Sequence, residues 1–208
     1  MTVHSFYDRE QRSQVDRLLP GDFTARKAGP GNNAMMMTVL GSCVSVCLTD
    51  KDKRIAGLNH FMLPGAISKS DLDTKVVNPL NSSARYGANA MELLINNLLE
   101  LGAERGRLHA WVFGGAKVLK GVSDIGQTNI NFALTYLKRE KIRISAQDTG
   151  GTLARKLYLD PSVCIPACFT ISRSLGELKA SENQYARLLQ LSPNGHQSDV
   201  SLFDRDNA

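Results

Sequence analysis

Apolar residues recur with helical spacing in two segments of this chain. In residues 84–101, five of them occupy positions i, i+3, i+4, i+7 and i+8, which lie on one face of a helix. They are Met91, Leu94, Ile95, Leu98 and Leu99. Ser83 suits the N-cap of this helix and Gly102 suits its C-terminal stop. A second helix with the same spacing is predicted to begin near Thr128.

The other apolar runs are short and are bounded by polar or glycine-containing segments, as expected for strands. These runs span residues 22–25, 35–40, 44–49, 54–61, 108–113, 142–147, 155–159 and 163–171. Because strands precede, separate and follow the two helices, the sequence predicts a mixed α/β class. The helices are expected to pack on a largely antiparallel sheet or pair of sheets.

The two ends of the chain are more polar than its middle. Residues 1–21 are predicted to be an N-terminal extension with a short helix over residues 11–19. Residues 22–171 form the predicted domain. Residues 172–208 form a polar C-terminal tail with one helix over residues 181–191. About the last 15 residues are predicted to be disordered.

The composition narrows the classes of function. A chain of 208 residues, 42% of them hydrophobic, suits one compact domain with an added tail. The net charge of +5 is spread without a block of like charges, so nucleic-acid binding has no specific support. No apolar stretch approaches the roughly 20 residues that cross a bilayer, and residues 1–10 lack the apolar core of a secretory signal. We therefore expect a cytoplasmic protein that is not embedded in a membrane, with reduced cysteines.

Cys43 carries the strongest chemical signal. It follows a small-residue turn, Gly41-Ser42, between two apolar runs, and His60 lies 17 positions later near the end of the next predicted strand. A thiol is a strong nucleophile as its thiolate, and a neighbouring imidazole often generates one. Glycine permits a tight turn whose N–H groups can face a developing oxyanion. The alternatives are a buried structural cysteine and a core histidine bonded to a carbonyl.

A third group usually orients the imidazole of such a pair, and Thr38 is the nearest candidate upstream of Cys43. The alternative is a threonine favoured for its β propensity. Two glycine pairs, Gly114-Gly115 and Gly150-Gly151, fit neither a phosphate loop nor a dinucleotide motif. We expect them to make turns at strand ends or to let a substrate chain approach closely.

The four cysteines form two pairs, Cys43 with Cys47 and Cys164 with Cys168. Both pairs lie in strand-like runs, where positions i and i+4 are about 13 Å apart and cannot share one tetrahedral ion. A structural zinc site made of these cysteines is therefore disfavoured. Cys47, Cys164 and Cys168 are interpreted as small buried apolar side chains.

Several short segments carry a further signal through their order along the chain. They are Thr38–Val44, Gly57–Pro64, Ala84–Gly87, Val112–Ala116, Ile125–Gly126 with Asn129, and Asp148–Gly151 with Arg155. In this order they resemble the chemoreceptor glutamine deamidase (CheD) family, over roughly residues 22–171. Several motifs in register are more specific than any one of them.

The resemblance implies a fold, an activity and three site residues. The fold is an α/β sandwich with mostly antiparallel sheets flanked by two main helices, similar to the cytotoxic necrotising factor deamidases. The activity is hydrolytic deamidation of specific glutamines to glutamate on methyl-accepting chemotaxis receptors, with no metal or organic cofactor. The catalytic cysteine of the family falls on Cys43 and its histidine on His60, and Thr38 is the nearest candidate for its threonine.

Recognition of a receptor's long helical bundle requires a surface of the enzyme. Arg85, Tyr86 and the two glycine pairs are candidate substrate-binding residues at its rim. The resemblance also implies a CheC-like chemotaxis phosphatase as a partner, so a non-catalytic adaptor that binds receptors and this phosphatase is the alternative function. A cysteine peptidase is a second alternative, against which the resemblance argues.

Overall fold

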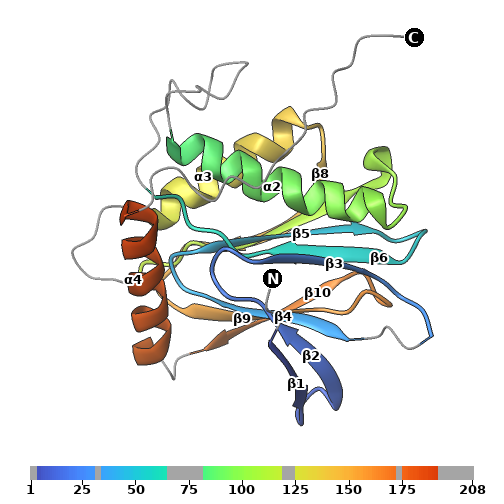
Figure 1. Cartoon of the computed structure of the whole chain (residues 1–208), viewed down its shortest axis with the longest axis horizontal. Coiled ribbons are helices and arrows are strands. Elements are labelled where there is room, and N and C mark those ends of the chain that lie inside the picture. Colours follow the sequence, from blue (N-terminus) through green and yellow to red (C-terminus); the bar gives the residue numbers. More distant parts are fainter. Residues whose placement is uncertain (1–3, 31–33, 65–81, 119–124, 172–174, 192–208) are drawn as a thin grey trace.

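The computed structural model describes residues 4–30, 34–64, 82–118, 125–171 and 175–191. The fold has three layers (Figure 1). Two helices cover one face of a five-stranded inner sheet, and a five-stranded outer sheet lies on its other face. One apolar core fills the space between helices and inner sheet, and another lies between the two sheets. The mixed α/β class with mostly antiparallel sheets, predicted from the sequence, is confirmed.

The inner sheet has the strand order β3-β6-β5-β7-β8. Its strands are β3 (Phe23–Lys27), β6 (Ile55–Asn59), β5 (Val44–Asp50), β7 (His109–Gly114) and β8 (Arg143–Thr149). Only the β7–β8 pair in this sheet is parallel. Strands β5 and β6 are buried at every position, because both of their faces are covered. The sequence predicted each of these five strands.

The outer sheet has the strand order β1-β2-β4-β9-β10. Its strands are β1 (His4–Asp8), β2 (Ser13–Arg17), β4 (Met35–Leu40), β9 (Ala154–Leu159) and β10 (Pro166–Ile171). The helix predicted over residues 11–19 is therefore wrong. Strands β1 and β2 form a hairpin, and β2 pairs in parallel with β4. This pairing buries Val15 against Met37 and Tyr158, a long-range contact that no local pattern contains.

The helices on the inner sheet are α2 (Ser82–Glu100) and α3 (Ile125–Arg139). The predicted C-terminal stop at Gly102 is confirmed, since this glycine has a φ of +98° and Ala103 N–H donates to the Leu98 carbonyl at 3.0 Å. Helix α2 begins at Ser82, so Ser83 lies inside the first turn and not at the predicted N-cap position. Helix α3 begins at Ile125, ahead of the predicted start near Thr128.

A third described helix, α4 (Leu175–Leu191), stands at one end of the two sheets (Figure 1). The helix predicted over residues 181–191 is confirmed in type but begins six residues earlier. The prediction of disorder over about the last 15 residues falls outside the described residues. Within the ranges that the structure describes, no helix has both the length and the apolar character needed to span a membrane.

Candidate active site

The turn between β4 and β5 carries Cys43. It is held in place by hydrogen bonds to the backbone carbonyl groups of its three residues. The Gly41 carbonyl accepts the Ala116 N–H at 2.7 Å, and the Cys43 carbonyl accepts the Gly115 N–H at 2.7 Å. The Ser42 carbonyl accepts the Asn129 side-chain amide at 2.9 Å. With its carbonyl groups fixed in this way, the turn directs the N–H groups of its three residues toward a single acceptor, described below.

Gly114 and Gly115 lie buried beneath this turn and not at the rim of a surface. Their φ angles are +103° and +69°, a region that favours glycine. A Cβ atom on Gly114 would lie 2.3 Å from the Cys43 carbonyl oxygen. The glycine pair therefore lets the end of β7 approach the turn closely enough to hydrogen bond with it.

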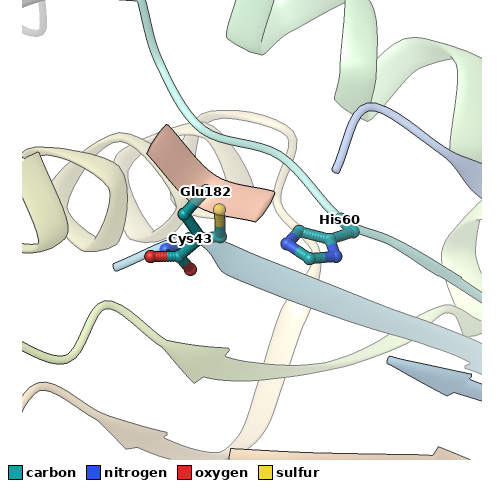
Figure 2. Close-up of side chains that lie close together, drawn as sticks. All are labelled: Cys43, His60 and Glu182. Atoms are coloured by element: carbon teal, nitrogen blue, oxygen red, sulfur yellow. The ribbon is translucent and has the colours of Figure 1, made fainter. Parts of the chain in front are cut away.

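The backbone of His60 is fixed on both sides. Its N–H donates to the Asp22 carbonyl at 2.8 Å, and its carbonyl accepts the Gly21 N–H at 2.7 Å. The next residue, Phe61, pairs with Val44 at the start of β5. This pairing brings His60 beside Cys43, although 16 residues separate them. Figure 2 shows the His60 ring beside Cys43, with one ring nitrogen on the side of the cysteine.

Thr38 fixes the orientation and tautomer of the His60 ring. The Thr38 hydroxyl donates its proton to the Leu18 carbonyl at 3.0 Å, so its oxygen accepts a hydrogen bond from His60 Nδ1–H at 2.7 Å. The proton on Nδ1 leaves the lone pair on Nε2. Within the described residues, Nε2 is buried and has no hydrogen-bond partner. The structure thus gives His60 a free basic nitrogen next to the thiol.

Burial keeps both groups neutral in this arrangement. Cys43 is 0% exposed and His60 is 2% exposed. Burial, with the negative charge of Glu182 and a hydrogen bond to it, raises the pKa of the Cys43 thiol well above its ordinary value. Burial lowers the pKa of His60 to about 4, against an opposing effect of the Glu182 charge. The site is therefore a thiol and a neutral imidazole at physiological pH.

Glu182 of α4 is the site residue that the sequence reasoning missed. Its carboxylate is 0% exposed and lies on the Cys43 turn. One oxygen, Oε1, accepts the N–H groups of Gly41 at 2.9 Å and Cys43 at 3.2 Å. The other, Oε2, accepts the Ser42 N–H at 3.0 Å and the Ser42 hydroxyl at 2.7 Å. An acidic residue within the apolar stripe of a helix was the available signal, and it lies outside the region of family resemblance.

Cys43, His60 and Glu182 also offer a donor set for a metal ion. One sulfur, one imidazole nitrogen and one carboxylate oxygen lie within 4.8 Å of one another, all in buried residues, and zinc accepts all three donor types (Figure 2). A carboxylate has about four lone-pair positions. Four hydrogen bonds from the turn already use them. The geometry therefore favours a hydrogen-bonded carboxylate over a metal ligand.

Comparison with known proteins assigns the chain to a family. The family model described as CheD chemotactic sensory transduction matches residues 62–165. A Shewanella oneidensis protein named probable chemoreceptor glutamine deamidase CheD 1 is 40% identical over 203 residues, which cover 95% of this chain and 92% of that protein. The chain belongs to the CheD family. A Chromobacterium violaceum CheD protein of the same description is 35% identical over 98% of this chain and 96% of its own length.

The two comparisons cover different parts of the site. The CheD family model begins at residue 62, after Cys43 and His60. The similarity to the Chromobacterium violaceum protein extends over 98% of the chain, so it includes the turn at Cys43 and continues through α4. The family assignment therefore rests on the whole chain and not on the nucleophile motif alone.

The remaining candidate residues from the sequence lie around this site in different ways. Tyr86 of α2 hydrogen bonds through its hydroxyl to the hydroxyl of Tyr185 on α4. Arg85, the preceding residue, is exposed. Gly150 and Gly151 follow β8 with positive φ angles, and the Gly150 N–H donates to the Gly114 carbonyl at 2.8 Å. Only Tyr86 of this group contacts α4 directly through a hydrogen bond that the structure describes.

Proposed function

We propose that this CheD-family chain hydrolyses the side-chain amide of particular glutamines on methyl-accepting chemotaxis receptors, which yields glutamate and ammonia. One observation carries the proposal. Three backbone N–H groups of the Cys43 turn donate to the Glu182 carboxylate, two to Oε1 and one to Oε2, beside a thiol and a buried imidazole nitrogen with a free lone pair. Relatives of high similarity are named probable chemoreceptor glutamine deamidases.

In the first half-reaction, His60 Nε2 takes the proton of the Cys43 thiol, and the thiolate attacks the glutamine carboxamide carbon. The N–H groups of Gly41, Ser42 and Cys43 stabilise the negative oxygen of the tetrahedral intermediate. The imidazolium then returns its proton to the departing nitrogen, and ammonia leaves. A thioester between Cys43 and the receptor side chain remains.

In the second half-reaction, His60 takes a proton from water, which attacks the thioester carbon. The same N–H groups stabilise the second oxyanion. The Cys43 sulfur leaves with the proton from His60, which regenerates the thiol and releases a glutamate side chain. Thr38 acts through His60 as a positioning residue, because its hydroxyl holds Nδ1–H and thus keeps the lone pair on Nε2.

The proposal extends to location and partners. Receptor regions that carry such glutamines are cytoplasmic, so we place the chain in the cytoplasm. A CheC-like phosphatase belongs to the proposal as a second partner, which would compete with receptors for the enzyme. Tyr86 and Arg85 are proposed receptor contacts. Both lie at the start of α2, and Tyr86 hydrogen bonds to Tyr185 of α4.

The test is to incubate the full chain with a chemoreceptor cytoplasmic fragment and to map glutamine-to-glutamate conversion by peptide mass spectrometry. Cys43→Ala is expected to abolish conversion. Cys47→Ala is the matched control, because Cys47 is a buried cysteine of β5, the strand that follows the Cys43 turn, and it should retain conversion. Conversion by the Cys43→Ala protein would overturn the mechanism. Binding without conversion by any form would favour the adaptor function.

A further inference from the structure

The Glu182 carboxylate occupies the position that the proposed mechanism assigns to the reacting amide group. Its oxygens accept hydrogen bonds from all three N–H groups of the Cys43 turn, at 2.9 to 3.2 Å. These are the donors that stabilise the oxyanion in catalysis. The side chain that lies there is a glutamate, which is also the side chain that the proposed reaction produces.

The turn has room for this side chain because of Gly41. A Cβ atom on Gly41 would lie 2.9 Å from both carboxylate oxygens of Glu182, closer than Cβ atoms approach other atoms. Gly21 plays the same part for the next turn of α4, since a Cβ atom there would lie 2.8 Å from the Tyr185 hydroxyl. The two glycines therefore shape a surface that accepts a helix with a Glu or Gln side chain at position 182.

Helix α4 meets this surface with a regular stripe. The residues that face inward lie at positions −4, +3, +4 and +7 relative to Glu182: Leu178, Tyr185, Ala186 and Leu189. Tyr185, Ala186 and Leu189 pack against the apolar cluster between the two sheets, and Tyr185 also bonds to Tyr86. The opposite face carries exposed residues such as Gln184 and Arg187. The described contacts of α4 with the site thus all come from the face that carries Glu182.

Seated in this way, α4 excludes substrate. Cys43 and Glu182 are 0% exposed and His60 is 2% exposed. While Glu182 accepts the N–H groups of Gly41, Ser42 and Cys43, a receptor glutamine cannot bind to the same groups. The receptor helix and α4 therefore cannot occupy the site together.

We propose that α4 is an intramolecular product mimic, which covers the docking surface for the receptor helix and places Glu182 in the subsite for the substrate glutamine. This inference rests on the proposed function. It also describes the partner: a helix whose reacting glutamine has apolar residues four positions before it and three, four and seven positions after it. Binding of such a helix requires release of α4, which makes the receptor itself the activator of the enzyme.

The charges around Cys43 agree with this arrangement. The negative charge of Glu182 contributes to the raised pKa of the Cys43 thiol, after burial. The other titratable groups near the site are His60, Tyr86 and Tyr185, while Asp22 and Arg17 act on them from the neighbouring loop and strand. Departure of α4 removes the carboxylate and opens the site to water, and both changes favour the thiolate.

The test uses full-length Glu182→Ala, with Gln184→Ala as the matched control on the exposed face of α4. Two rates are measured: alkylation of Cys43 by iodoacetamide, mapped on its peptide, and deamidation of a receptor fragment. Loss of even one charge-assisted hydrogen bond shifts the equilibrium between seated and released α4 by about tenfold. Both rates should therefore rise by about tenfold or more in Glu182→Ala and stay unchanged in the control. Leu189→Ala, which loosens α4 without touching the turn, should raise both rates as well.

The outcomes separate the two proposals. Unchanged or slower alkylation in both Glu182→Ala and Leu189→Ala, with circular dichroism showing folded proteins, would overturn the product mimic. Faster alkylation without receptor conversion by any variant would overturn the deamidase function and leave α4 as a cover of Cys43. Stoichiometric zinc in the purified wild-type chain that is lost in Glu182→Ala would replace the inference with a metal site.

Discussion

Thr38 Oγ1 lies 2.7 Å from His60 Nδ1 and donates its own proton to the Leu18 carbonyl. Because the threonine proton is committed, the hydroxyl oxygen can only accept, and the imidazole proton must lie on Nδ1. One hydroxyl on β4 thereby determines which nitrogen of a histidine 22 residues away is basic. This relationship gives the first prediction.

Thr38→Val keeps the shape of the side chain but removes the hydroxyl. The buried Nδ1–H then loses the Thr38 oxygen as its acceptor, and the ring is held less firmly in one tautomer. An unsatisfied buried group costs about 1 to 3 kcal/mol, so kcat for deamidation should fall about fivefold to a hundredfold with little change in KM. Thr38→Ser restores the hydroxyl and should recover most of the activity. Equal losses in the valine and serine variants would contradict the positioning role.

The depressed pKa of His60 predicts how stability depends on pH. Burial lowers this pKa from 6.5 to about 4, so the unfolded chain gains a proton at a higher pH than the folded chain does. Protonation of His60 therefore does not affect the free energy of unfolding above pH 6.5, and it lowers that free energy as the pH falls toward 4. Urea unfolding should show a loss of up to about 1.4 kcal/mol per pH unit from this proton.

The matched variant for this measurement is His60→Gln, which has no titrating group at the position but can still bond to Thr38. Its stability should fall less steeply than that of the wild type over the same pH window. The difference between the two curves isolates His60 from the carboxyl groups, which titrate in both proteins. Parallel curves would show that His60 is not held neutral by the fold.

Asn129 predicts a stability effect that reaches the nucleophile turn. Its side chain accepts the Leu63 N–H at 2.9 Å and donates to the Ser42 carbonyl at 2.9 Å, in a fully buried position on α3. Asn129→Ala leaves both groups without a partner and should lower the free energy of unfolding by about 2 kcal/mol or more. Denaturant unfolding measures this change in the free energy of unfolding. Asn131→Ala, at an exposed position of the same helix, should stay within about 0.5 kcal/mol of the wild type.

Glu182→Gln converts the product mimic into a substrate. The carboxamide oxygen can keep the N–H groups of Gly41 and Cys43, and its amide can donate to the Ser42 hydroxyl, while the Ser42 N–H loses its acceptor. We expect Cys43 to deamidate this residue within its own chain, so that the purified variant carries glutamate at position 182 again. Peptide mass spectrometry detects the change, with Gln184 in the same helix as an internal reference that stays unmodified.

The double variant Cys43→Ala with Glu182→Gln should retain glutamine at position 182. Retention of glutamine in the single variant as well would mean that α4 does not present residue 182 to Cys43 in an attacking geometry. Conversion in both variants would point to spontaneous hydrolysis and would contradict a role of the thiol.

Local pattern was sufficient for most strands and for the type of each helix, and it failed where long-range pairing decided the outcome. The helix predicted over residues 11–19 contains few apolar positions, so main-chain pairing of β2 with β4 outweighed its weak local preference. The turn at Gly41-Ser42 and the strand that leads to His60 could be recognised because glycine spacing and apolar runs are local properties. The proximity of Cys43 and His60 could not be derived from local pattern, because it depends on the pairing of Val44 with Phe61.

The sequence by itself determined the α/β class, the core-facing stripe of α2 with its glycine stop, and the segments that carry Thr38, Cys43 and His60, because side-chain period and turn chemistry act over a few residues. Only the tertiary structure decided that Nδ1 of His60 carries its proton and that Glu182, 139 residues after Cys43, lies on the nucleophile turn. A carboxylate has no local preference for a buried site, even within the apolar stripe of a helix. It is held there by N–H groups that converge only after the two sheets and α4 have packed together.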